Sequence, residues 1–133
     1  MDFSGIITPG KKGRKEERVT DAHTARFYGS GGLPVYATPA MAALMEGAAV
    51  EAVEGLLPEG WSTVGTELAI KHLAPTPPGL LVRASAELVE IDGRRLEFRV
   101  EAADGLEKIG EGTHQRFIIE NKKFIEKAEK KRE

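Results

Sequence analysis

The spacing of apolar residues changes once along this chain, near residue 60, and that change limits the folds available to it. Before it, ATPAMAALMEGAAVEAVEGLL (37–57) has the 3.6-residue period of an amphipathic helix. After it, WSTVGTELAIKHLA alternates between apolar and polar positions, as a strand with one buried face does. We therefore predict one long helix over 39–57, with Thr38 as its N-cap and Pro39 in its first turn, followed by strands.

Three more segments alternate in the same way: LLVRASAELVEI, RRLEFRVEA and KIGEGTHQRFII. The pair DG between the first two is a strong hairpin signal. A weaker strand, EERVTDAHTARF, precedes the long helix, and NKKFIEKAEKKRE predicts a short C-terminal helix with a docking stripe of Phe124, Ile125 and Ala128. Neither the helix nor the sheet can cover its own apolar face. The order of elements therefore predicts an α+β hot-dog fold, an antiparallel sheet wrapped around the helix, which favours dimerisation.

Composition sets the remaining bounds. The 133 residues predict one domain over 19–133, and Pro and Gly in ITPGKKGRKE indicate a flexible N-terminal arm over 1–18. There is no cysteine, so a disulfide, a zinc thiolate and a cysteine nucleophile are excluded. No apolar run is long enough to span a membrane, and no basic segment precedes an apolar one as in a signal peptide, so we expect a cytoplasmic protein. The basic C-terminal segment lacks interleaved aromatic residues, which argues against nucleic acid as a partner.

Three residues have the chemistry expected at a reaction site. Glu46 falls on the apolar side of the predicted helix, where a carboxylate is costly unless it is paired or protonated. Thr38 begins the helix, close to its partial positive charge. His72 ends an apolar strand face before a Pro-rich break. Each alone has an ordinary structural explanation, but together they supply acid, base and hydroxyl for splitting an acyl bond.

Four segments, taken in order, carry a family resemblance: VYATPAMAALMEGAAVEAV, VGTELAIKHLAPTPPG, VEIDGRRLEFRVEA and GEGTHQRFII. From about Val19 onward the chain closely resembles the fluoroacetyl-CoA-thioesterase-like branch of the hot-dog thioesterases. The resemblance implies an acyl-CoA thioesterase with Thr38, Glu46 and His72 as its catalytic residues. Thr38 and Glu46 lie about 12 Å apart along one helix, so His72 or a second subunit must complete the site. Either Thr38 or Glu46 could be the nucleophile, or Glu46 could activate water.

The resemblance also suggests substrate-binding residues: Gly65, where a strand glycine admits close approach, and Arg116 near the pocket. The alternative explanations are a β-bulge at Gly65 and a cross-strand salt bridge at Arg116. Tyr36 is a third candidate, since it could cover the acyl group. The family's lid is aromatic, whereas this chain has YGSGGLP at 28–34. We therefore expect weak selectivity for a fluoroacetyl group.

The expected substrate is a short-chain acyl-CoA, with no metal and no cofactor, in a homodimer or a pair of such dimers. Candidate partners for the coenzyme A phosphates are basic residues among which the sequence does not choose: Arg83, Arg94, Arg95 and Lys108. The alternative function is a non-catalytic acyl-CoA or small-molecule binding protein. A hot-dog hydratase is less favoured, because IKHLAPT has no acid beside its histidine.

Overall fold

The computed structural model describes residues 2–133, and the first residue of the predicted arm lies outside that range. Five strands form one antiparallel sheet: β1 Lys12–Arg18, β2 Trp61–His72, β3 Leu81–Asp92, β4 Arg95–Ala103 and β5 Lys108–Glu120. The helices are α1 Ala25–Tyr28, α2 Thr38–Val53 and α3 Asn121–Glu129, with single 3-10 turns at Asp21–His23, Glu54–Leu56 and Lys130–Arg132.

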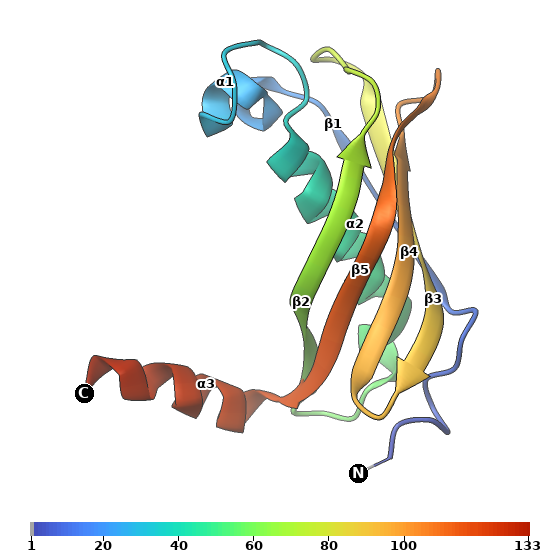
Figure 1. Ribbon diagram of the computed structural model, residues 1–133, viewed down its shortest axis with the longest axis vertical. Helices are drawn as coiled ribbons and strands as arrows, with labels where there is room; N and C mark the ends of the chain where they lie inside the picture. Colours follow the sequence, from blue (N-terminus) through green and yellow to red (C-terminus); the bar gives the residue numbers. More distant parts are fainter. Residues whose placement is uncertain (1) are drawn as a thin grey trace.

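The sheet curls around α2, which runs along its concave face (Figure 1). The strand order is β1-β3-β4-β5-β2, so β1 and β2 form the two edges. Along α2 the buried positions recur every three or four residues and include Met41, Met45 and Ala48, which face inward-pointing residues of the strands such as Leu88 and Phe98. The predicted hot-dog fold, its four strong strands and its short C-terminal helix are confirmed.

The prediction of a flexible arm over 1–18 is wrong for most of that segment. Phe3 and Ile7 are buried in the core, and Lys12–Arg18 forms β1, paired antiparallel with β3. Gly13 permits this pairing, because a Cβ at that position would overlap the carbonyl oxygen of Ala48 on α2. β1 has a mostly polar sequence, so alternation of apolar and polar residues does not predict it. Backbone hydrogen bonds stabilise an edge strand whatever its side chains are.

The predicted strand EERVTDAHTARF is correspondingly misplaced. Only its first residues belong to β1, and the rest forms the 3-10 turn at Asp21–His23 and the short helix α1. Thr24 caps α1 by accepting a hydrogen bond from the Phe27 backbone N–H. The side-chain hydrogen bonds of these threonine-rich turns compete with strand pairing.

Two details of the predicted helices also need correction. Ala37, not Thr38, is the N-cap of α2, and Thr38 is the first helical residue. The predicted stripe on α3 does not dock on the rest of the chain, because Phe124 and Ile125 are exposed and α3 points away from the sheet (Figure 1). None of the helices within residues 2–133 has the length and apolar character to cross a membrane.

Candidate active site

Thr38 and His72 meet at one end of the molecule. The first turn of α2 places Thr38, and the last residue of β2 is His72, 34 positions later in the chain. Thr38 Oγ1 lies 2.7 Å from His72 Nδ1, a short hydrogen bond between a hydroxyl and an imidazole. Because Ala37 is the N-cap of α2, the Thr38 hydroxyl does not cap the helix. Thr38 is exposed, so its hydroxyl can contact both His72 and a ligand.

The surroundings of His72 favour its neutral form. Burial lowers the pKa of His72 below its ordinary value of 6.5, because desolvation penalises the imidazolium. A neutral imidazole with an unprotonated Nδ1 accepts the Thr38 hydroxyl proton, and Nε2 then carries the ring hydrogen. Nε2 is buried without a hydrogen-bond partner in residues 2–133. The pair therefore has the geometry of a hydroxyl beside its base.

A cavity of about 370 Å³ opens beside this pair. Its wall includes Thr38, His72 and Tyr36, together with Ser30 and Val35 from the segment before α2. The cavity is large enough for a small acyl group and lies next to the Thr38 hydroxyl.

Tyr36 lines this cavity but its side chain is almost wholly buried. Its hydroxyl donates a 2.7 Å hydrogen bond to Glu17 Oε2 on β1. Burial and this carboxylate raise the pKa of Tyr36 far above its ordinary value, so the phenol remains protonated. The observed role of Tyr36 is to join the cavity wall to β1, and its contact with substrate stays a prediction.

Glu46 lies halfway along α2 at the edge of the buried stripe, not in its middle as the helical period predicts. Its side chain is 42% exposed, and the nearest charge is Arg116 Nη1, 3.7 Å from Glu46 Oε2. The buried face of α2 is centred instead on methionine and alanine positions: Met41, Met45, Ala48 and Ala52. A carboxylate placed this way can be reached from outside the chain.

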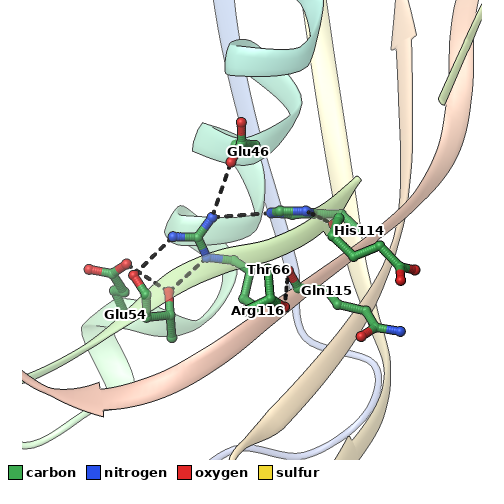
Figure 2. Close-up of polar contacts among 8 residues, drawn as sticks. Glu46, Glu54, Thr66, His114, Gln115 and Arg116 are labelled. Carbon is green, nitrogen blue, oxygen red and sulfur yellow. Dashed lines mark hydrogen bonds and ion pairs between the residues drawn. The ribbon is translucent and has the colours of Figure 1, made fainter. Parts of the chain in front are cut away.

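Arg116 is nearly buried and is held from three sides (Figure 2). It donates to Thr63 on β2 through Nε (2.8 Å) and Nη2 (2.9 Å, to the backbone oxygen). Nη1 contacts His114 Nε2 at 3.1 Å. Thr63 in turn donates to Glu54 at 2.9 Å, which brings a second carboxylate to the network. Arg116 thus has a fixed position from which its charge faces Glu46.

His114 has one tautomer in this network. Its Nδ1 lies 2.8 Å from the backbone oxygen of Glu67, which can only accept, so Nδ1 carries the hydrogen. Nε2 then accepts from Arg116. Burial and the Arg116 charge lower the pKa of His114, which keeps the ring neutral. The neutral ring leaves Arg116 as the positive charge opposite Glu46.

Gly65 makes room for the glutamate. A Cβ at this position would lie 2.8 Å from Glu46 Oε2 and 3.2 Å from His114 Cε1. The strand register also shifts between Gly65 and Glu67, so the β-bulge considered from the sequence is present. The absence of a side chain at 65 therefore opens the sheet face to the Glu46 carboxylate.

The predicted site residues fall into two groups within one chain. Thr38, His72 and Tyr36 lie at the start of α2, whereas Glu46, Gly65 and Arg116 lie about two helical turns further along. Eight residues of helix separate Thr38 from Glu46, which is about 12 Å along the axis. One chain therefore does not bring Glu46 to the Thr38–His72 pair.

Sequence reasoning did not single out His114, Thr63 or Glu54. A usable signal exists for His114, because it precedes Arg116 by two residues on β5 and shares its sheet face. No comparable signal exists for Thr63 and Glu54, which meet only through the fold.

Comparisons with known proteins identify the family. Residues 19–122 match the sequence family described as fluoroacetyl-CoA-specific thioesterase. A fluoroacetyl-CoA thioesterase of Streptantibioticus cattleyicolor is 46% identical over 97 residues, covering 73% of this chain and 70% of the relative. This chain belongs to the fluoroacetyl-CoA-specific thioesterase family. The predicted resemblance is confirmed, and the protein is a thioester hydrolase.

Solved structures agree with this membership of the fluoroacetyl-CoA-specific thioesterase family. The structure of the fluoroacetyl-CoA thioesterase FlK superposes with a TM-score of 0.87 at 39% identity, over 94% of this chain and 97% of that one. A thioesterase superfamily member of Thermus thermophilus superposes with a TM-score of 0.85 at 34% identity, over 95% of each chain.

Proposed function

We propose that the protein hydrolyses short-chain acyl-CoA thioesters, with Thr38 as nucleophile, His72 as its base and Glu46 as the base that activates water. The observation that carries the proposal is the 2.7 Å contact between Thr38 Oγ1 and His72 Nδ1 beside a cavity of acyl size. A hydroxyl within reach of a neutral imidazole is the arrangement that nucleophilic acyl transfer requires.

The first half of the reaction forms an acyl-threonine. His72 takes the hydroxyl proton as Thr38 Oγ1 attacks the thioester carbonyl, and the proton passes to the departing coenzyme A thiolate. The first turn of α2 can stabilise the oxyanion with N–H groups that have no partner inside the helix. Pro39 has no N–H and that of Met41 donates to Ala37, so the donors available there are Thr38 and Ala40.

The second half releases the acid. Glu46 removes a proton from water as the water oxygen attacks the acyl carbon, the bond from that carbon to Thr38 Oγ1 breaks, and the proton passes to Oγ1 and restores the hydroxyl. Because Glu46 lies about 12 Å from Thr38 in its own chain, we assign this step to Glu46 of a second copy. The half-exposed side chain of Glu46 and the edge position of β2 support such an arrangement. The proposal therefore includes a homodimer with a shared site.

A chain-length screen tests the activity. The protein is incubated with acetyl-, propionyl-, butyryl- and longer acyl-CoAs, and free thiol is followed over time. Release of thiol with turnover on the short chains supports the proposal. Stoichiometric binding of the same compounds without thiol release would favour the non-catalytic binding protein.

The pH profile gives a prediction for His72. As a base, His72 must be neutral. Burial lowers its pKa, so His72 becomes half protonated only at a pH below the ordinary histidine pKa of 6.5. We expect kcat/KM to fall on the acidic side with a midpoint below 6.5, and to be flat from there to neutrality. Measuring kcat/KM for butyryl-CoA across pH tests this. An acidic limb at or above 6.5 would contradict the proposed role.

Self-association is a second prediction. Sedimentation at micromolar concentration is expected to give a dimer, because an open sheet edge and an incomplete site both call for another copy. An active monomer at the same concentration would contradict the shared site.

The loop at 28–34 gives a prediction about selectivity. Ser30 lines the cavity beside Thr38, and Gly32 has open space around it. The aromatic residue in the cavity lining is Tyr36, whose hydroxyl is bonded to Glu17 on β1. A small change in an apolar pocket is worth only about 1–3 kcal/mol even with snug contact. After correction for uncatalysed hydrolysis, kcat/KM for acetyl- and fluoroacetyl-CoA should therefore be similar, and butyryl-CoA should be accepted.

Gly32→Phe sharpens this measurement. The position has no positive φ and space for a ring, so the variant should fold and lower kcat/KM for butyryl-CoA relative to acetyl-CoA by about tenfold. Gly5→Phe, also in open space but outside the loop at 28–34, is the matched control. A wild-type preference of several orders of magnitude for fluoroacetyl-CoA would refute the open-loop explanation.

A further inference from the structure

A second cavity, of about 230 Å³, lies where α3 leaves the sheet. The start of β2, the β3–β4 turn, the end of β5 and α3 supply its lining. Figure 1 shows α3 extending away from the lower end of β5. The charged and aromatic residues of this lining are Trp61, Arg94, Glu120, Lys123, Phe124 and Lys127. We call this the α3 groove.

Arg94 is held in place in the α3 groove without being neutralised. Its guanidinium carbon lies 5.0 Å from the centre of the Trp61 ring, a cation–π contact. Trp61 is itself fixed by an edge contact with buried Phe3, with ring centres 5.2 Å apart. Within residues 2–133, Arg94 makes no ion pair. A cation fixed by stacking and free of carboxylates is prepared to bind an anion.

The other basic residues considered for the phosphates are neutralised. Arg83 pairs with Glu16 at 2.9 Å, and Arg95 pairs with Glu90 at 2.7 Å. Lys108 contacts two carboxylates, at 3.0 and 3.2 Å. An anion would have to displace these partners, whereas at Arg94 it would not. The structure therefore separates Arg94 from the candidates that the sequence left equal.

The α3 groove as a whole is positive. Lys123 and Lys127 stand one helical turn apart on α3 and face the same cavity as Arg94. The acid in the lining, Glu120, lies 3.8 Å from Lys123 in an exposed pair of the kind that contributes little. Residues 121–133, which include these two lysines, carry six basic groups against three acidic ones. The lining thus offers three cations against one carboxylate.

One face of β2 joins the α3 groove to Gly65, which lies beside the Glu46 carboxylate. Trp61, Thr63 and Gly65 alternate along β2 and share a face. Four residues of strand separate Trp61 from Gly65, about 13 Å at 3.3 Å per residue. The pantetheine arm of coenzyme A separates its phosphates from its thioester by a length of this order. In the proposed shared site, the carbonyl attacked by Thr38 of one copy lies near Glu46 and Gly65 of the other, so the phosphates can reach the α3 groove of the copy that supplies Glu46.

We propose that the α3 groove binds the phosphate groups of the nucleotide half of coenzyme A, through Arg94, Lys123 and Lys127. This proposal rests on the proposed function, because it assigns the nucleotide end of the same substrate. Binding there contributes to KM and leaves the chemical step to the groups at the far end of the pantetheine arm.

The test compares two butyryl thioesters, butyryl-CoA and butyryl-N-acetylcysteamine, which keeps the reacting end and lacks the phosphates. Arg94→Gln and the double variant Lys123→Gln/Lys127→Gln are each expected to raise KM for butyryl-CoA by about tenfold with kcat unchanged. kcat/KM for the truncated thioester should stay at the wild-type value. Arg83→Gln, an exposed and paired arginine outside the groove, is the matched control and should change neither substrate.

A binding measurement separates this proposal from the catalytic one. Calorimetric titration with free coenzyme A and with pantetheine, which lacks the nucleotide, is made on wild type and both groove variants. Lower affinity for coenzyme A alone supports the groove assignment even where turnover is undetectable. Unchanged coenzyme A affinity, or equal losses for both thioesters, would overturn it. Failure of wild type to cleave either thioester, with coenzyme A binding still dependent on Arg94, would sink the proposed function only.

Discussion

Replacing Glu46 by glutamine is expected to lower kcat by at least about 100-fold while leaving the fold in place. Glutamine keeps the size of the side chain but cannot take a proton from water. The stability cost should be small, because Glu46 is 42% exposed and its contact with Arg116 is 3.7 Å long. Arg116 is nearly buried, but in the variant it keeps its hydrogen bonds to Thr63 and His114, and a half-exposed ion-pair partner contributes about 0–1 kcal/mol.

The same variant can reveal the intermediate. If Glu46 drives hydrolysis of an acyl-threonine, Glu46→Gln should release one coenzyme A per site in a burst and retain the acyl group. Acid quenching and peptide mass analysis then place the acyl group on the Thr38 peptide. Glu51→Gln is the matched control, since Glu51 is an exposed carboxylate on the same helix whose replacement still accepts from the Arg14 backbone.

Two results would contradict this role for Glu46. Wild-type turnover in Glu46→Gln would remove the glutamate from the chemistry altogether. An acyl group trapped on the Glu46 peptide in Thr38→Ala would instead make Glu46 the nucleophile, as an anhydride. Thermal unfolding of each variant shows whether a loss of activity comes from a loss of structure.

Thr38→Ala is expected to have the other large effect, a loss of at least about 100-fold in kcat/KM. The substitution removes the hydroxyl that contacts His72 at 2.7 Å and leaves the helix cap, which is Ala37, unchanged. Thr38→Ser restores the hydroxyl and should recover most of the activity. Equal activity of the alanine and serine variants would show that the hydroxyl takes no part in the reaction.

The two inactive variants together test the shared site. In a dimer that joins Thr38 and His72 of one copy to Glu46 of the other, a Thr38→Ala/Glu46→Gln heterodimer holds one intact site and one doubly altered site. Random exchange of equal amounts of the two variants should then recover about one quarter of wild-type activity. If each chain held a complete site, the mixture would remain as inactive as its components.

Most of the sheet and the long helix could be predicted from the sequence. The strands β2 to β5 alternate apolar and polar residues over nine or more positions, and α2 repeats its alanines and methionines at helical spacing. These patterns involve residues close together in the chain, so they can be recognised without knowledge of the fold. The same stretches carry the family resemblance, which made Thr38, Glu46 and His72 candidates together.

The fold decided what the local pattern could not. β1 is polar and becomes a strand only because β3 offers it a free edge and Gly13 lets it pass α2. The sequence predicted Thr38 as a helix cap. In the fold the β2 strand places His72 beside Thr38, and the Thr38 hydroxyl forms a hydrogen bond with the His72 ring.

The tertiary structure also fixed the surroundings of Glu46 and of the basic residues. The helical period predicted a buried Glu46. In the structure the buried face of α2 points away from Glu46, and the Glu46 carboxylate lies beside Gly65 on β2. Arg94 stacks on Trp61, whereas strand pairing and the β3–β4 turn bring carboxylates to Arg83, Arg95 and Lys108. The sequence by itself determined the elements and the chemical groups, because periodicity and side-chain identity are local. The pairing of those groups depended on contacts between residues far apart in the chain, which strand register, helix rotation and close approach at glycine decide.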